Sequence, residues 1–153
     1  MRNKLPLAAA IFATFVTFAG GCAAMQRVPG HTAPKARVDV TAVTMEAFSK
    51  RSVGGQLELS VQNPSRVVVE LRYLEWEMSV GGDRVVGRTE LNGQIPANAS
   101  APLSAALEVL AADAERVVPH LDEGIRDYEL HGVLHYDTPS GDASVGFQSS
   151  GTL

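Results

Sequence analysis

The side chains best suited to chemistry in this chain are its histidines, of which His131 and His135 lie four residues apart. Alternating apolar residues predict a strand here, so both rings fall on one face, roughly 13 Å apart at about 3.3 Å per residue. Two nitrogens that bind one zinc ion each lie about 2.0–2.1 Å from it, so this pair cannot share a metal. His31 and His120 fall in other predicted segments. We therefore expect solvent-facing strand histidines, with no metal ligands and no cofactor.

The carboxylates alternate mostly with apolar residues, which is typical of a solvated strand face. They include Glu70, Glu75, Glu77, Glu90 and Glu129. Glycoside hydrolysis needs two carboxyl groups that converge in a cleft, and this spacing indicates none. The sequence also contains no Gly-x-Ser-x-Gly elbow, no phosphate loop and no Gly-x-Gly-x-x-Gly motif. We expect no catalytic residues and no enzymatic activity.

Cys22, the single cysteine, follows a segment with the layout of an export signal. Arg2 and Lys4 precede an apolar run over residues 5–18, and small residues occupy positions 19–21. The run is shorter than the roughly 20 residues of a membrane-spanning helix. The small residues before the cysteine resemble the lipobox of bacterial lipoproteins, although alanine stands at position 19 where leucine is commoner. Two alternatives are an ordinary cleaved signal with an incidental cysteine and an uncleaved membrane helix.

The lipoprotein resemblance implies that residues 1–21 are removed and that Cys22 carries a thioether-linked diacylglycerol, with a further acyl group such as palmitate in many species. Each buried methylene contributes about 0.8 kcal/mol, so two or three chains make a stable membrane anchor. Ala23 follows the cysteine and favours the outer membrane, facing the periplasm, over the inner membrane. Residues 22–36 contain Pro29, Gly30 and Pro34 without periodicity, which predicts a flexible tether in the cell envelope.

The charge of the chain argues against nucleic acid as a partner. The chain has 17 acidic and 13 basic residues, and removal of residues 1–21 takes away two of the bases and leaves a net charge of −6. Binding to phosphates needs a basic surface, and so does attraction to anionic lipid head groups. We expect contact with the membrane through the lipid on Cys22 alone.

From residue 37 to residue 153 the pattern indicates one all-β domain. Apolar and polar residues alternate in about seven segments, and turn residues separate them. Residues 110–123 instead have apolar residues at helical spacing, and we expect Pro119 to shorten or break this short helix. With a single predicted helix, repeated βαβ units are excluded. The pattern favours an antiparallel β-sandwich of the immunoglobulin or fibronectin-III type.

A change of phase marks the segment over residues 67–80. Val67, Val69 and Leu71 occupy one phase and the apolar residues from Leu74 to Val80 the other, with the change near Tyr73. A continuous strand cannot keep both sets on one face, so we predict a β-bulge or sharp bend near residues 72–73. Residues 81–83 predict a tight hairpin turn after it.

Four pieces of the chain together resemble the type 2 late-embryogenesis-abundant proteins, also called the WHy (water stress and hypersensitive response) domain. They are Leu57-x-Leu59-x-Val61-x-Asn63-Pro64, Val69-x-Leu71-x-x-Leu74-x-Trp76-x-Met78-x-Val80-Gly81, Ile95-Pro96-Ala97, and Tyr128-x-Leu130-x-Gly132 through Asp137-Thr138-Pro139-x-Gly141 to Phe147 and Gly151. The order and spacing of the pieces over residues 37–152 carry the resemblance, because no single piece is specific.

This resemblance implies structural roles for the motif residues Asn63, Pro64, Trp76, Gly81, Pro96 and Gly132. Asn63 can bond backbone groups at a strand end, where Pro64 fixes the turn. Trp76 stands where the family more often has tyrosine, and its phase predicts a core residue rather than an exposed ligand platform. The family looks non-enzymatic, and its members are linked to desiccation and stress tolerance.

Three hypotheses for function follow. The first is a lipid-anchored stress-protection or binding module that acts on a stressed client protein. The second is a structural or adaptor lipoprotein that docks another envelope protein through a sheet edge. The third, a hydrolase, has no motif in its favour.

Overall fold

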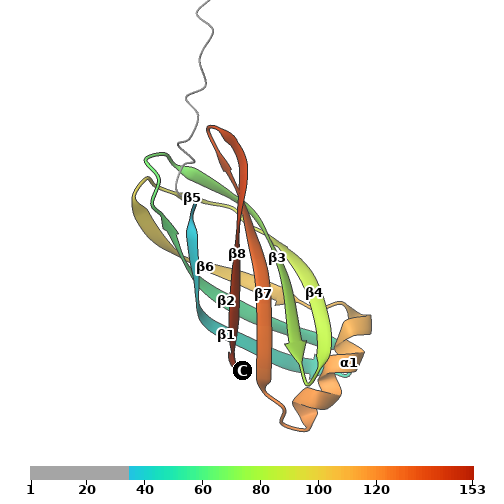
Figure 1. Ribbon diagram of the computed structural model, residues 1–153. Coiled ribbons are helices and arrows are strands. Elements are labelled where there is room, and N and C mark those ends of the chain that lie inside the picture. Colours follow the sequence, from blue (N-terminus) through green and yellow to red (C-terminus); the bar gives the residue numbers. More distant parts are fainter. Residues whose placement is uncertain (1–34) are drawn as a thin grey trace, which may run out of the picture. The chain divides into compact units, whose positions relative to one another are not determined.

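Two antiparallel sheets form the part of the chain that the computed structural model describes, residues 35–153 (Figure 1). The predicted signal over residues 1–21, Cys22 and nearly all of the predicted tether lie outside the described residues. The strands are β1 (Arg37–Ser49), β2 (Ser52–Asn63), β3 (Val69–Val80), β4 (Asp83–Glu90), β5 (Gln94–Ile95), β6 (Ala99–Glu108), β7 (Asp127–Thr138) and β8 (Gly141–Thr152), and the helix is α1 (Ala111–Asp122).

The first sheet has the strand order β1-β2-β6, and the second has the order β4-β3-β7-β8 with β5 paired to β3. The apolar inner faces of both sheets contribute to one buried core. The all-β sandwich is therefore confirmed, with eight strands, one of them only two residues long, against about seven predicted.

The first hairpin extends further than the sequence pattern predicts. β1 continues to Ser49 and turns over residues 50–51 into β2. The register of β1 against β2 shifts between Val40 and Ala42 and again between Ala47 and Ser49. Each shift inserts an extra residue, which breaks the alternation in the sequence and hides the second half of the strand.

The predicted bulge in β3 is confirmed. Leu71 pairs with Tyr136 and Tyr73 pairs with His135, so Arg72 is the extra residue opposite β7. Leu71 before the bulge and Leu74 after it are both buried, as the change of phase requires. The Gly81–Gly82 turn that follows joins Val80 to Asp83, with both glycines at positive φ. Such angles are typical of the type I′ turn that two-residue hairpins prefer.

Helix α1 lies within one residue of the predicted bounds at each end, but the expectation that Pro119 shortens or breaks it was wrong. The helix continues through Pro119 for three more residues. Buried Val117, Val118 and Leu121 hold it against the core. The missing N–H of Pro119 removes a single helical hydrogen bond, and the buried residues on both sides of it keep the last turn in place.

Glycines and aromatic residues alternate across one level of the second sheet. Gly87 of β4 pairs with Trp76 of β3, Trp76 pairs with Gly132 of β7, and Gly132 pairs with Phe147 of β8. A Cβ atom at Gly87 would lie 2.2 Å from the Trp76 ring, and one at Gly132 would lie 2.2 Å from the Phe147 ring. Each ring therefore covers the glycine beside it, an arrangement that compensates for the missing side chain.

Candidate functional site

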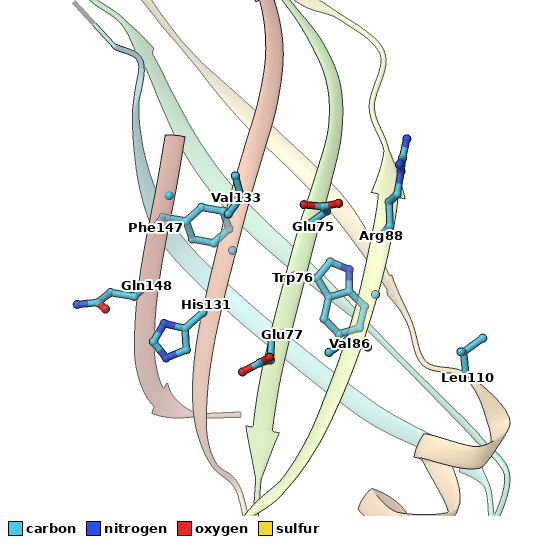
Figure 2. A pocket seen from close by; sticks show the side chains of 13 residues that line it. Glu75, Trp76, Glu77, Val86, Arg88, Leu110, His131, Val133, Phe147 and Gln148 are labelled. Atoms are coloured by element: carbon cyan, nitrogen blue, oxygen red, sulfur yellow. The ribbon is translucent and has the colours of Figure 1, made fainter. Parts of the chain in front are cut away.

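An open groove of about 940 Å³ crosses the outer face of the second sheet (Figure 2). Its floor is the row of paired residues Gly87, Trp76, Gly132 and Phe147 across the four strands. The neighbouring rows of outward-facing residues, one on each side of this floor, form its walls. One row contains Arg88, Glu75, Val133 and Gly146, and the other contains Val86, Glu77, His131 and Gln148. We call this feature the sheet groove.

Stacked side chains stiffen the first wall of the sheet groove. The rings of Tyr73 and His135 are parallel within 18°, with centroids 4.3 Å apart. The Arg88 guanidinium lies 3.6 Å from the centre of the Tyr73 ring, close enough for a cation–π contact. His135 Nε2 also lies 3.1 Å from a carboxylate oxygen of Glu75. The bulge in β3 positions this wall, because it turns Tyr73 towards the outer face.

The second wall combines charged and apolar side chains. Arg84 pairs with Glu77 at 3.2 Å. Val86 is 50% exposed, and Leu110, which lines the same groove just before α1, is 69% exposed. An open groove with paired charges and exposed apolar side chains suits contact with a polypeptide surface better than enclosure of a small molecule.

His131 and His135 lie on the outer face of β7, as the sequence predicts, but they are not free of contacts, and His31 lies outside the described residues. His131 borders the sheet groove and His135 belongs to its stacked wall. His120 of α1 has Nε2 2.8 Å from Asp83, and its Nδ1 is buried without a hydrogen-bond partner. Among residues 35–153, no three His, Cys, Asp or Glu side chains are grouped so that they could hold a metal ion.

Asn63 forms a buried polar link between two loops. Its side-chain nitrogen donates to the carbonyl oxygens of Val67 at 2.8 Å, Ile95 at 3.1 Å and Pro96 at 3.0 Å. Its side-chain oxygen accepts from the backbone nitrogen and the hydroxyl of Ser65. The residue is 1% exposed, so these bonds satisfy groups that water cannot reach. Asn63 thereby ties the end of β2 to β5.

The remaining motif residues lie in the framework of the sandwich. Pro64 follows Asn63 in the loop between β2 and β3. Trp76 is 3% exposed and donates its ring N–H to the hydroxyl of Thr89 at 3.3 Å. That hydroxyl donates to the carbonyl of Ala106 at 2.6 Å, which links the second sheet to β6. Gly81 packs against the His120 ring, which lies 2.5 Å from where a Cβ atom would be.

Sequence reasoning missed Tyr73, Arg88 and Gly87 as parts of this surface. A glycine within a strand often marks a close approach of another group, so Gly87 carried a usable signal. The predicted hairpin at residues 81–83 sets β3 beside β4, but the stack of Tyr73 and Arg88 also needs His135 of β7, which only the fold brings beside β3. The predicted lipidation site, Cys22, lies outside the described residues.

Residues 58–151 match the family model of the LEA type 2 group of late embryogenesis abundant proteins. The match covers more than half of the chain, and the protein belongs to this family. A search of curated proteins finds no matching relative.

Solved structures support the same fold. A solution structure of an Arabidopsis thaliana protein aligns with 79% of this chain and 82% of its own, at a TM-score of 0.59 and 23% identity. A crystal structure of a protein from Archaeoglobus fulgidus aligns with 75% of this chain and 98% of its own, at a TM-score of 0.54 and 11% identity. At these identities the likeness extends to the sandwich fold alone.

Proposed function

We propose that this protein is a membrane-anchored, non-enzymatic lipoprotein whose LEA type 2 domain protects or binds other proteins in the cell envelope during desiccation or related stress. Family membership over residues 58–151 is the observation that carries the proposal. The lipid on Cys22 holds the domain at the membrane, with the periplasmic side of the outer membrane as the proposed location. No helix within residues 35–153 is long and apolar enough to cross a membrane.

The sheet groove is the proposed contact surface for a client protein. Val86 and Leu110 present apolar area at one end, and the charges of Arg88 and Glu75 lie along the wall. A partly unfolded client exposes both apolar and charged groups, and a wide groove with both kinds of lining can contact them without enclosing them.

A drying and heating assay tests this proposal. A client enzyme such as citrate synthase is dried or heated alone and with a several-fold molar excess of the purified protein, and its residual activity is measured. We expect the protein to preserve most of the activity. No protection at that excess would contradict a direct protective role.

Paired substitutions test whether the sheet groove is the contact surface. Val86→Lys with Leu110→Lys places two charges in its apolar end, and we expect protection to fall several-fold. Val67→Lys with Val68→Lys makes the same chemical change at exposed residues of the loop between β2 and β3, outside the groove, and we expect protection to persist. The reverse result would assign the contact to the loop.

The adaptor alternative rests on a separate observation, the edge of the second sheet at β8, which no strand within residues 35–153 covers. Pull-down of the anchored protein from membranes distinguishes the two functions. Recovery of one stoichiometric envelope protein, independent of stress, supports the adaptor and contradicts general protection.

A further inference from the structure

Apart from the two-residue β5, four strands lie at the edges of the two sheets in the part of the chain that the structure describes, and three of them carry features that discourage pairing with another chain. These edge strands are β1 and β6 in the first sheet and β4 and β8 in the second. The free side of an edge strand presents unpaired backbone groups to any other strand, and proteins protect it with bulges, charges, proline or cover.

Each of the first three edges has a recognisable protection. β1 has two register shifts, which bend the strand. β6 contains Pro102, and its Ala106 carbonyl accepts a hydrogen bond from Thr89 of the other sheet. β4 carries four charged residues among its eight. These features make continuous pairing with a further strand unfavourable at all three edges.

β8 has none of these protections. It is twelve residues long, contains no proline, lysine or arginine, and has a single charge, Asp142, near its start. Its register with β7 runs without a shift from the Thr138–Gly141 pair to the Asp127–Thr152 pair. Within the described residues, β7 is the only strand that pairs with β8. β8 is therefore a long, regular and nearly uncharged edge.

The inner side of β8 is also incompletely covered. Ala143, Val145 and Phe147 pack against the core but are only half-buried, and so are Val38 and Val40 on β1, the edge strand of the other sheet. The equivalent residues of the neighbouring strand β7 are buried. A strand added beside β8 would pair its backbone and cover this apolar strip at the same time.

We propose that β8 is a dimer interface that pairs antiparallel with β8 of a second copy of this chain. A two-residue turn, residues 139–140, joins β7 to β8, and the Thr138–Gly141 pair that flanks such a turn is a hydrogen-bonded pair. Hydrogen-bonded pairs alternate along an antiparallel ladder, so the odd-numbered residues of β8 form the backbone hydrogen bonds to β7. The even-numbered residues then have free backbone groups that point outwards. Two such edges complete each other's hydrogen bonds and join the second sheets of both copies into one continuous sheet.

The side chains of β8 are compatible with this self-pairing. When Gly146 lies opposite Gly146 of the second copy, Val145 of each copy lies opposite Phe147 of the other, so this contact forms on both sides of the two-fold axis. Ser144 then faces the partner's Gln148, and Asp142 faces an uncharged serine. No like charges meet in this register, and each copy covers the half-buried Val145 and Phe147 of the other, which is why we favour a second copy over an unrelated strand as the occupant.

Sedimentation of three forms of the full mature chain tests the proposal, with Cys22→Ser in each to keep the protein out of membranes. We expect the parent chain to form a dimer in a concentration-dependent manner. Ser144→Lys with Gln148→Lys places like charges opposite each other across the two-fold axis, and we expect dimer affinity to fall about tenfold or more. Ser144→Lys with Gln148→Glu pairs opposite charges instead, and we expect it to restore the dimer.

The two double variants control for each other, because both introduce two charges on the outer face of β8 and differ in one sign only. Equal urea midpoints for their monomers would exclude a folding defect as the cause. A parent chain that remains monomeric at millimolar concentration would overturn the proposal. A dimer that both variants leave unchanged would overturn it as well.

A disulfide provides a second test of the register. Directly opposed residues in a hydrogen-bonded antiparallel pair have Cα atoms about 5.5 Å apart, within the range of a disulfide. In the same Cys22→Ser chain, we expect Gly146→Cys to cross-link into dimers under mild oxidation and Val86→Cys on β4 to remain monomeric. Cross-linking of Gly146→Cys to a different protein in envelope extracts would instead assign β8 to an adaptor contact. Neither result depends on lipidation or on client protection.

Discussion

At the scale of single residues, glycines beside aromatic rings determine the inner surface of the second sheet. Trp76 lies over Gly87 and Phe147 lies over Gly132, so a large side chain fills the space that its neighbour leaves empty. The same arrangement leaves no inward room for a methyl group at either glycine. The motif residues Trp76 and Gly132 therefore belong to the same packed row of the sheet.

Gly132→Ala tests this packing. The added Cβ would lie 2.2 Å from Phe147 Cζ, so the ring must move from its place against the core. We expect a loss of about 1–3 kcal/mol in the free energy of unfolding, which is typical of overpacking, measured by urea denaturation.

Gly146→Ala is the matched control, because it lies on the adjacent strand and its nearest contact would be an ordinary 3.8 Å. We expect a change within about 0.5 kcal/mol, as for most surface substitutions. Equal losses for the two variants would show that the Phe147 contact is not the cause.

At the scale of secondary-structure elements, the bulge in β3 connects the sequence pattern to the sheet groove. The bulge accommodates the extra residue, Arg72, while the buried residues on both sides of it still face the same core. Tyr73 faces outwards beside it, where the ring meets His135 on β7 and Arg88 on β4. The bulge thereby preserves both the core and the outer surface.

Deletion of Arg72 is expected to leave the fold intact. Without it, the residues from Val69 to Val80 alternate regularly, and the pairs with β7 on both sides of the bulge are retained. The losses are the Arg72–Asp137 ion pair, which is worth about 0–1 kcal/mol at an exposed site, and the hydrogen bond from Leu91 N–H to the Arg72 carbonyl, which is worth about 1 kcal/mol. Circular dichroism and urea denaturation measure the result.

Deletion of Glu75 is the comparison, because it shortens the same strand by one residue in a regular stretch. That change turns the residues on one side of the deletion to the wrong face. We expect no cooperative unfolding transition for this variant. If both deletions unfold the protein equally, Arg72 is essential to β3 for a reason other than the alternation of inward and outward side chains.

At the scale of the whole molecule, the described chain enters the sandwich at one end and places α1 at the other (Figure 1). Arg37, at the start of β1, pairs with Gln62 at the end of β2, close to the exposed Val67 and Val68 of the following loop. The start of the described chain therefore lies nearer this loop than α1.

Cys22→Ser tests the anchor itself. The variant cannot form the thioether to diacylglycerol, so we expect it to move from the membrane fraction to the soluble fraction on cell fractionation. Its urea midpoint should equal that of the parent chain, because the sandwich over residues 35–153 does not include this residue. Membrane association as tight as that of the parent would contradict lipid anchoring at Cys22.

The sequence alone determined the features that depend on neighbouring residues. Alternation along each strand revealed the sandwich, the change of phase at Tyr73 revealed the bulge, and the paired glycines revealed the turn after β3. These predictions succeed because side-chain direction in a strand has a period of two and turns need particular backbone angles. The second half of β1 was not predicted for the same reason, because its two bulges interrupt the alternation of apolar and polar residues.

Only the tertiary structure decided which strands lie next to one another. The sheet groove and the Tyr73–His135–Arg88 stack both depend on β7 lying beside β3, a strand distant from it in sequence. β8 likewise has the sequence of an ordinary strand, and its position at an edge follows from the order β4-β3-β7-β8. Strand order depends on packing of the whole core, a sum over long-range contacts that no local pattern contains.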